Sequence, residues 1–89
     1  MARGPSLPQY EPTTVRERLG YLVEECGEVL AAAGKSLRWG LDSWNPELSP
    51  EQRESNADWL ARELDDLEAA IARVRPVLDR TRVGEDVAG

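Results

Sequence analysis

Two pairs of acidic residues are the side chains in this sequence best suited to chemistry. Glu25 and Glu28 lie three residues apart, and so do Glu63 and Asp66. Residues at this spacing project together from one turn of a helix. Glu25, Glu28 and Glu63 have no Lys or Arg three or four positions away, and Asp66 has only Arg62. Four facing carboxylates would bind a hard cation such as Mg²⁺ or Mn²⁺; the alternative is a set of exposed acids in a highly charged chain.

The first acid pair lies on a segment with helical periodicity. Thr14 and Glu17 form a capping-box pattern, and an apolar stripe with alternating spacings of four and three follows, so the sequence predicts a helix at 14–37. We expect Cys26 in the core because it belongs to this stripe. The stripe consists of Val15, Leu19, Leu22, Cys26, Val29, Ala33 and Leu37.

The second acid pair lies on a second predicted helix. Glycine and proline interrupt the periodicity over 38–49, which is therefore a predicted loop. Ser49, with Pro50 directly after it and Gln52 three residues on, has the pattern of a capped helix start, which predicts a helix at 50–75. Pro76 is expected to kink or end this helix. Its apolar stripe consists of Leu60, Leu64, Leu67, Ile71, Val74 and Leu78.

These elements predict one all-α domain at 14–79, built as an antiparallel helical hairpin. A proline-containing extended arm at 1–13 precedes it, and a flexible tail at 80–89 follows. Each interior glycine costs a helix up to about 1 kcal/mol relative to alanine. A column of glycines seven residues apart therefore suggests a second, closely packed face on the first helix, the alternative being a weak, frayed helix: Gly20, Gly27 and Gly34. We expect a homodimer or a higher homo-oligomer to complete the core.

Composition limits the classes of partner. The chain has 89 residues and a formal net charge of -6, which argues against a nucleic-acid polymer or an anionic membrane as the main partner. It contains no apolar run near the roughly 18 residues that span a bilayer, and no secretory signal is evident. One cysteine, which has no internal partner, suits the cytoplasm. Histidine is absent, so acid–base chemistry near neutral pH must come from carboxylates, Lys, Tyr or metal-bound water.

The stretch "EECGEVLAAAGKSLRWG", followed later by "ARELDDLEAAI", resembles the MazG-like all-α NTP pyrophosphohydrolase superfamily. The likeness covers about residues 14–75 and looks closest to compact members found in phages, for which the host cytoplasm would be the location. The family signature, E-x-x-E and then E-x-x-D, maps onto the two acid pairs. The resemblance implies a helical, usually oligomeric bundle that binds Mg²⁺ through Glu25, Glu28, Glu63 and Asp66. It also implies hydrolysis of a (d)NTP to the monophosphate and pyrophosphate.

The resemblance assigns further roles to individual residues. The expected catalytic set is Glu24, Glu25 and Glu28, in which a carboxylate not committed to the metal takes the proton from water; Glu24 is the first candidate and Glu28 the second. Lys35 and Arg38 would hold the phosphate tail, although cations also support a helix C-terminus without any ligand. Trp39 and Trp44 would stack on the base or cap the bundle end, and Trp59 would face the pocket or a partner subunit. Asn56 is either a base-edge ligand or an exposed polar residue. The predicted substrate-binding set is Tyr21, Lys35, Arg38, Trp39, Asn56 and Trp59.

Two other functions remain compatible with the sequence. The first is an acidic helical interaction module whose stripes pair with another protein or with a second copy. The second is a nucleotide-binding sensor on the same scaffold, which binds nucleotide with Mg²⁺ but releases no pyrophosphate.

Overall fold

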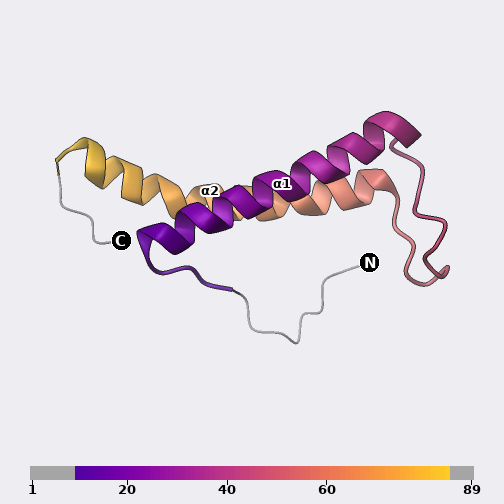
Figure 1. The fold of residues 1–89 in the computed structure, drawn as a ribbon, viewed down its shortest axis with the longest axis horizontal. Helices are drawn as coiled ribbons and strands as arrows, with labels where there is room; N and C mark the ends of the chain where they lie inside the picture. The colour runs from indigo at the N-terminus through magenta and orange to yellow at the C-terminus, as the bar shows by residue number, and fades with distance from the viewer. Residues whose placement is uncertain (1–9, 85–89) are drawn as a thin grey trace.

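The computed structural model describes residues 10–84 and shows two helices packed as an antiparallel hairpin (Figure 1). Helix α1 spans Val15–Trp39 and helix α2 spans Asn56–Arg82. The described residues form no strand beyond one isolated bridge between Trp44 and Ser55 in the loop. The all-helical hairpin predicted from the sequence is therefore confirmed. Residues 1–9 of the predicted arm and 85–89 of the predicted tail lie outside the described residues.

Helix α1 begins where the capping box predicted it. The Thr14 hydroxyl accepts a hydrogen bond from the Glu17 backbone at 3.0 Å, and the Glu17 carboxylate accepts from the Thr13 and Thr14 backbone. These bonds, with that of Thr13 the largest contribution, hold the pKa of Glu17 below its ordinary value. The helix ends at Gly40, whose φ of 98° lies in the region that favours glycine. It runs two residues further than the predicted end at Leu37.

Helix α2 begins six residues later than the sequence predicted. The Ser49 motif closes a local turn instead, in which the Gln52 backbone donates to the Ser49 carbonyl at 2.9 Å. Ser55 is the actual cap, and its hydroxyl accepts from the Asp58 backbone at 3.1 Å. The N–H groups that open α2 are satisfied by the loop, because Asn56 donates to the Ser43 carbonyl at 2.8 Å. The loop therefore supplies the hydrogen-bond acceptors at the start of α2, and residues 50–55 do not form the helical turn that the sequence predicted.

Pro76 does not end α2, which continues to Arg82. Proline removes one helical hydrogen bond, but Val74 and Val77 on either side of it are both buried. Their burial holds the chain in the helical path across the proline. The residues 80–82 therefore belong to the helix and not to the predicted tail.

The fully buried apolar side chains of the two helices are small. Ala32 on α1 and Ala70 on α2 are fully buried, and Pro12 before α1 is buried as well. At the far end, the Arg18 guanidinium donates to the Arg73 carbonyl at 3.1 Å. Small residues allow the two backbones to approach closely, but they bury little apolar area. Neither helix is long and apolar enough to cross a membrane, among the residues that the structure describes.

The predicted apolar stripe of α1 is only partly buried. Cys26, which we expected in the core, is exposed, as are Leu19 and Leu37. The face that contacts α2 is rotated around the helix toward Glu25 and Ala32, which are the buried residues of α1. The predicted glycine face is open within the described chain, because nothing lies within 4 Å of a Cβ built on the glycines of α1. An apolar flank of α1 is left outside the hairpin as a result.

Candidate metal centre and adjoining pocket

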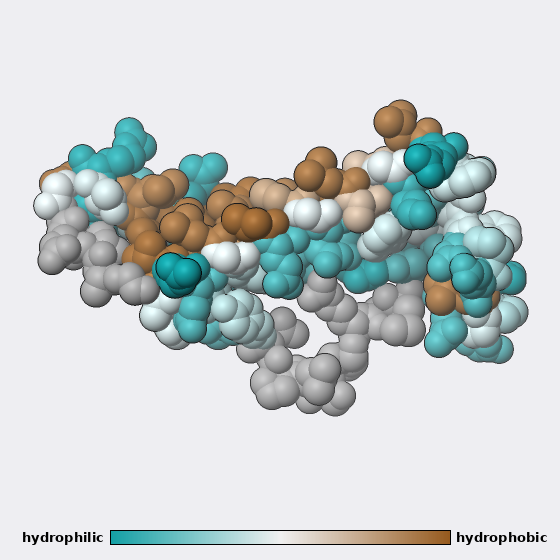
Figure 2. All heavy atoms as spheres, viewed as in Figure 1, coloured by the Kyte–Doolittle hydropathy of each residue, from teal (hydrophilic) through white to brown (hydrophobic). Residues whose placement is uncertain are grey.

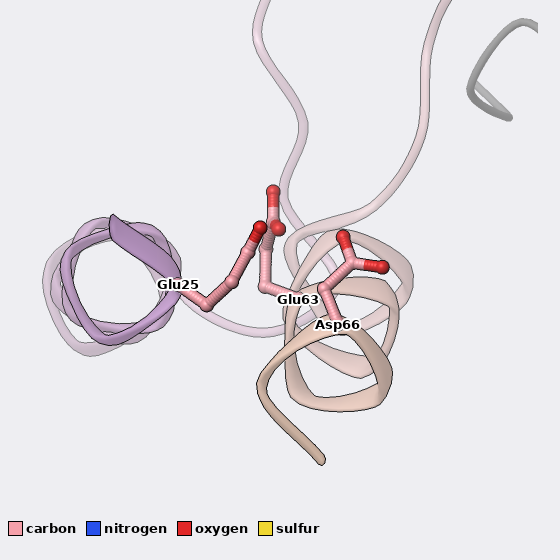
Figure 3. A group of neighbouring side chains, drawn as sticks. All are labelled: Glu25, Glu63 and Asp66. Atoms are coloured by element: carbon pink, nitrogen blue, oxygen red, sulfur yellow. The ribbon is translucent and has the colours of Figure 1, made fainter. Parts of the chain in front are cut away.

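Three acidic side chains converge between the two helices. Glu25 projects from α1 toward Glu63 and Asp66 on α2 (Figure 3). One carboxylate oxygen from each residue lies within 4.8 Å of the other two. Glu25 and Glu63 are both 2% exposed, and Asp66 is half-buried. Burying carboxylates together is costly unless positive charge or hydrogen bonds compensate.

The antiparallel register explains why these residues meet. The Asn56 side chain reaches the Lys35 carbonyl at one end of the hairpin, and Arg18 reaches the Arg73 carbonyl at the other. Because both helices rise about 1.5 Å per residue, this register places Glu25 level with Asp66. Residues three apart share a helix face, so Glu63 and Asp66 point to the same side.

Two neighbours on α2 interact with the acidic cluster. The Trp59 indole donates to Oε2 of Glu63 at 3.0 Å. The Arg62 guanidinium lies 3.6 Å from the same oxygen and hydrogen-bonds Glu54 in the loop. The hydrogen bond with Glu54 raises the pKa of Arg62 despite partial burial, and the charges of Glu63 and Asp66 add to this effect. Arg62 therefore offsets part of the cluster's negative charge.

A pocket of about 700 Å³ lies beside the cluster, between the end of α1, the loop and the start of α2. Trp59 lines this pocket and also contacts Glu63, so the pocket and the cluster share one wall. Asn56 is buried in the pocket wall, where its amide donates to the Gly40 carbonyl at 2.9 Å. The volume is within the range of small-molecule sites, which is about 300–1,000 Å³. Its lining includes one cation and three indoles: Lys35, Trp39, Trp44 and Trp59.

The structure assembles most of the predicted site. Of the four predicted metal ligands, Glu25, Glu63 and Asp66 come together, whereas Glu28 is exposed and outside the cluster. Glu24, the first candidate for the general base, is exposed as well. Glu28 fails to join because its side chain projects toward solvent along the flank of α1, away from the contact with α2.

The predicted substrate-binding residues divide into two groups. Lys35, Trp39, Asn56 and Trp59 line the pocket. Asn56 is not the exposed polar residue that we considered as its alternative role, because its amide anchors the loop. The remaining two are not among the lining residues: Arg38 is exposed, and Tyr21 packs edge-on against Tyr10 with ring centroids 5.5 Å apart.

Sequence reasoning missed one part of the site. Glu54 and Arg62 form an ion pair that links the loop to the cluster, over eight residues in the chain. An ion pair between a loop residue and a helix residue produces no periodic pattern in the sequence, so it could be identified only from the structure. Trp44 lines the pocket under the Arg53 guanidinium, which lies 5.6 Å from the ring centroid. Trp44 was considered from the sequence as a residue that stacks on a base or caps the bundle end, and it lies in the pocket lining together with Trp39.

No protein-family model, curated protein or solved structure matches this chain. What the site can do chemically therefore follows from its geometry.

Proposed function

We propose that the protein is a Mg²⁺-dependent nucleoside triphosphate pyrophosphohydrolase, which converts a (d)NTP and water into the (d)NMP and pyrophosphate. The observation that carries this proposal is the convergence of Glu25, Glu63 and Asp66 beside a pocket lined by Lys35 and three tryptophans. A cation site next to an aromatic pocket matches a substrate with an anionic tail and a planar base. The resemblance of the acid motifs to the MazG-like family supports the same reaction.

The donor set fits a hard divalent cation. Mg²⁺ prefers oxygen ligands and is held by one or two carboxylates together with substrate phosphates. Glu25 and Glu63 are buried, so a cation between them would compensate the cost of their burial. Bound Mg²⁺, or Mn²⁺ in its place, would supply charge neutralisation for the triphosphate and activation of water.

The chain's own residues supply binding and orientation. The Trp59 indole fixes the Glu63 carboxylate, and it presents its ring to the pocket. Lys35, on the α1 wall, provides an ammonium group for phosphate oxygens. The rings of Trp39 and Trp44 are half or more exposed and offer stacking surfaces for a base. A nucleoside triphosphate would then bind with its phosphates near the acidic cluster and its base near the loop tryptophans.

A nucleotide sensor is the second candidate, and the position of Glu28 favours it. With Glu24 and Glu28 both exposed, no carboxylate of α1 other than Glu25 lies in the cluster. A hydrolase on this scaffold needs a group that accepts the proton from water. A site that binds Mg²⁺ and nucleotide without such a group would hold the substrate and leave it intact.

The test is pyrophosphate release from a panel of canonical, uracil-containing and modified (d)NTPs, with Mg²⁺ and with EDTA. We expect Mg²⁺-dependent release by the native chain and none by Glu63→Gln. Asp65→Asn is the matched control, because Asp65 is an exposed acid on the same helix turn and outside the cluster. It should behave as the native chain does.

Absence of release from folded protein across the whole panel would contradict the hydrolase proposal. Equilibrium binding of a non-hydrolysable triphosphate then separates the alternatives. Mg²⁺-dependent binding that Glu63→Gln abolishes supports a sensor, whereas absence of binding contradicts both nucleotide-dependent functions.

A further inference from the structure

Arg62, a cation of helix α2, lies against the acidic cluster without a hydrogen bond to it. Nη1 of Arg62 is 3.6 Å from Oε2 of Glu63, which is an ion-pair distance but too long for a hydrogen bond. Asp66 lies one turn further along α2, and residues four apart share a helix face. The charge of Arg62 therefore offsets part of the cluster's negative charge from the α2 side.

The Arg62 guanidinium is held more firmly on its other side. Its Nη2 donates a hydrogen bond to Oε1 of Glu54, in the loop before α2. Its Nε is buried and has no hydrogen-bond partner in the described chain. An arginine side chain carries five N–H donors in a rigid fork. The hydrogen bond that this fork makes to a carboxylate thus goes to the loop and not to the cluster.

Glu54 is a well-placed acceptor for this guanidinium. The next residue, Ser55, caps α2 and forms an antiparallel bridge with Trp44 across the loop. The side chains of Arg62 and Glu54 are 28% and 19% exposed, so both reach water. Figure 2 shows mostly hydrophilic surface around the loop end of the hairpin. The guanidinium can therefore leave Glu63 and remain paired and hydrated at Glu54.

We propose that Arg62 is a built-in counterion that competes with the divalent cation for the Glu63 carboxylate and moves fully to Glu54 when the metal binds. This inference rests on the cation site proposed above and adds a regulatory element to it. A metal ion held by Glu63 shares that carboxylate with the guanidinium, and two positive charges on one carboxylate repel each other. Arg62 thus offsets the cluster's charge when no metal is bound, and it lowers the affinity of the site for the metal.

An ion pair that only fastens the loop makes a different prediction. If the pair between Arg62 and Glu54 were such an anchor, removing either partner would break the same bond and change the metal affinity in the same direction. Competition predicts opposite directions. Removing Arg62 frees the Glu63 carboxylate for the metal, whereas removing Glu54 leaves the cluster as the acceptor for the guanidinium.

The measurement is Mn²⁺ binding by isothermal titration calorimetry, with the metal alone and no nucleotide. Arg62→Gln should lower the dissociation constant about tenfold, since coupling between two ligands of one site is typically about 5–150-fold. Glu54→Gln should raise the constant by about threefold or more. Arg75→Gln is the matched control, because it removes the same charge from an exposed position about 20 Å further along α2 and should leave the constant unchanged.

A double variant keeps the test decisive if Arg62→Gln folds poorly. Glu54→Gln combined with Arg62→Gln has the native net charge and lacks the ion pair. Competition predicts that this protein binds Mn²⁺ at least about tenfold more tightly than Glu54→Gln alone. A loop anchor predicts equal binding by these two proteins, because the bond is already absent in the single variant. Circular dichroism of each variant checks that the helices form.

The outcomes separate this inference from the cation site on which it rests. Equal dissociation constants for the native chain and Arg62→Gln, or weaker binding by both single variants, would overturn the role of Arg62 and leave the cation site standing. Mn²⁺ binding that Glu25→Gln leaves unchanged, or no binding by any of these proteins, would contradict the cation site and the inference together.

Discussion

Replacing Glu25 by glutamine should stabilise the protein when divalent cations are absent. The change removes one charge from three acids whose oxygens lie within 4.8 Å of one another. At that separation two carboxylates repel by about 3.5 kcal/mol for an effective dielectric constant of about 20. Arg62, 3.6 Å from Glu63, offsets part of this repulsion. We therefore expect the free energy of unfolding to rise by about 1–2 kcal/mol in EDTA.

Mg²⁺ should reverse the order of stabilities. A cation that binds only the folded protein stabilises it by about 2.7 kcal/mol at a concentration of 100 Kd. The native chain should gain this amount, and Glu25→Gln should gain less because one ligand has lost its charge. The assay is urea unfolding followed by circular dichroism, in EDTA and in Mg²⁺, with Glu24→Gln as the exposed control on the same helix. A Glu25→Gln protein that is less stable than the native chain in EDTA, or that gains as much from Mg²⁺, would refute the reasoning.

Three further changes test the fold. Asn56→Ala removes the 2.9 Å hydrogen bond from the Asn56 amide to the Gly40 carbonyl, which keeps the longer bond from the Ser43 backbone, and should cost about 0.5–1.5 kcal/mol in urea unfolding; an unchanged urea midpoint would contradict the anchoring role of Asn56. Thr14→Ala removes the cap of α1 and should cost about 0.5–2 kcal/mol, with faster amide exchange confined to the first turn. The hydrogen bonds from Thr13 and Thr14 lower the pKa of Glu17, so the stability they confer is complete above its ordinary value near 4.5 and is lost as pH falls through the lower folded-state pKa. Glu17→Gln should flatten that acid limb of the stability profile, and a limb of equal slope would contradict the assignment.

The sequence predicted the helices better than their rotation about their own axes. The Thr14–Glu17 box and the periodic stripes were sufficient for an all-helical hairpin, because capping and periodicity are local properties. The start of α2 was misplaced because the Ser49 hydroxyl donates to the Gln52 side chain within a local turn. The residue pattern of a helix cap is equally compatible with such a turn. Helix α2 continues through Pro76 because Val74 and Val77 are buried against the rest of the hairpin. This packing cannot be predicted from the local sequence.

The candidate site was predictable in composition and less so in geometry. Spacing identified Glu25, Glu63 and Asp66, which the hairpin brings together. Spacing also selected Glu28, which lies outside the cluster. Spacing along a helix cannot show which edge of an apolar stripe will face the other helix. The stripe of α1 is divided between the contact with α2 and the open face that exposes Cys26. Which residues of the stripe face α2 is decided by how the two helices pack, and the sequence of one helix does not contain that information.

The central claim is that the acidic cluster serves cleavage between the α- and β-phosphates of a nucleoside triphosphate. Phosphorus-31 NMR of a reaction with Mg²⁺ tests it most directly, because the products identify the bond that breaks. The account predicts resonances of a nucleoside monophosphate and pyrophosphate, which appear with native protein and are absent with Glu63→Gln. A nucleoside diphosphate with inorganic phosphate, or an unchanged triphosphate in the presence of folded protein and Mg²⁺, would contradict it.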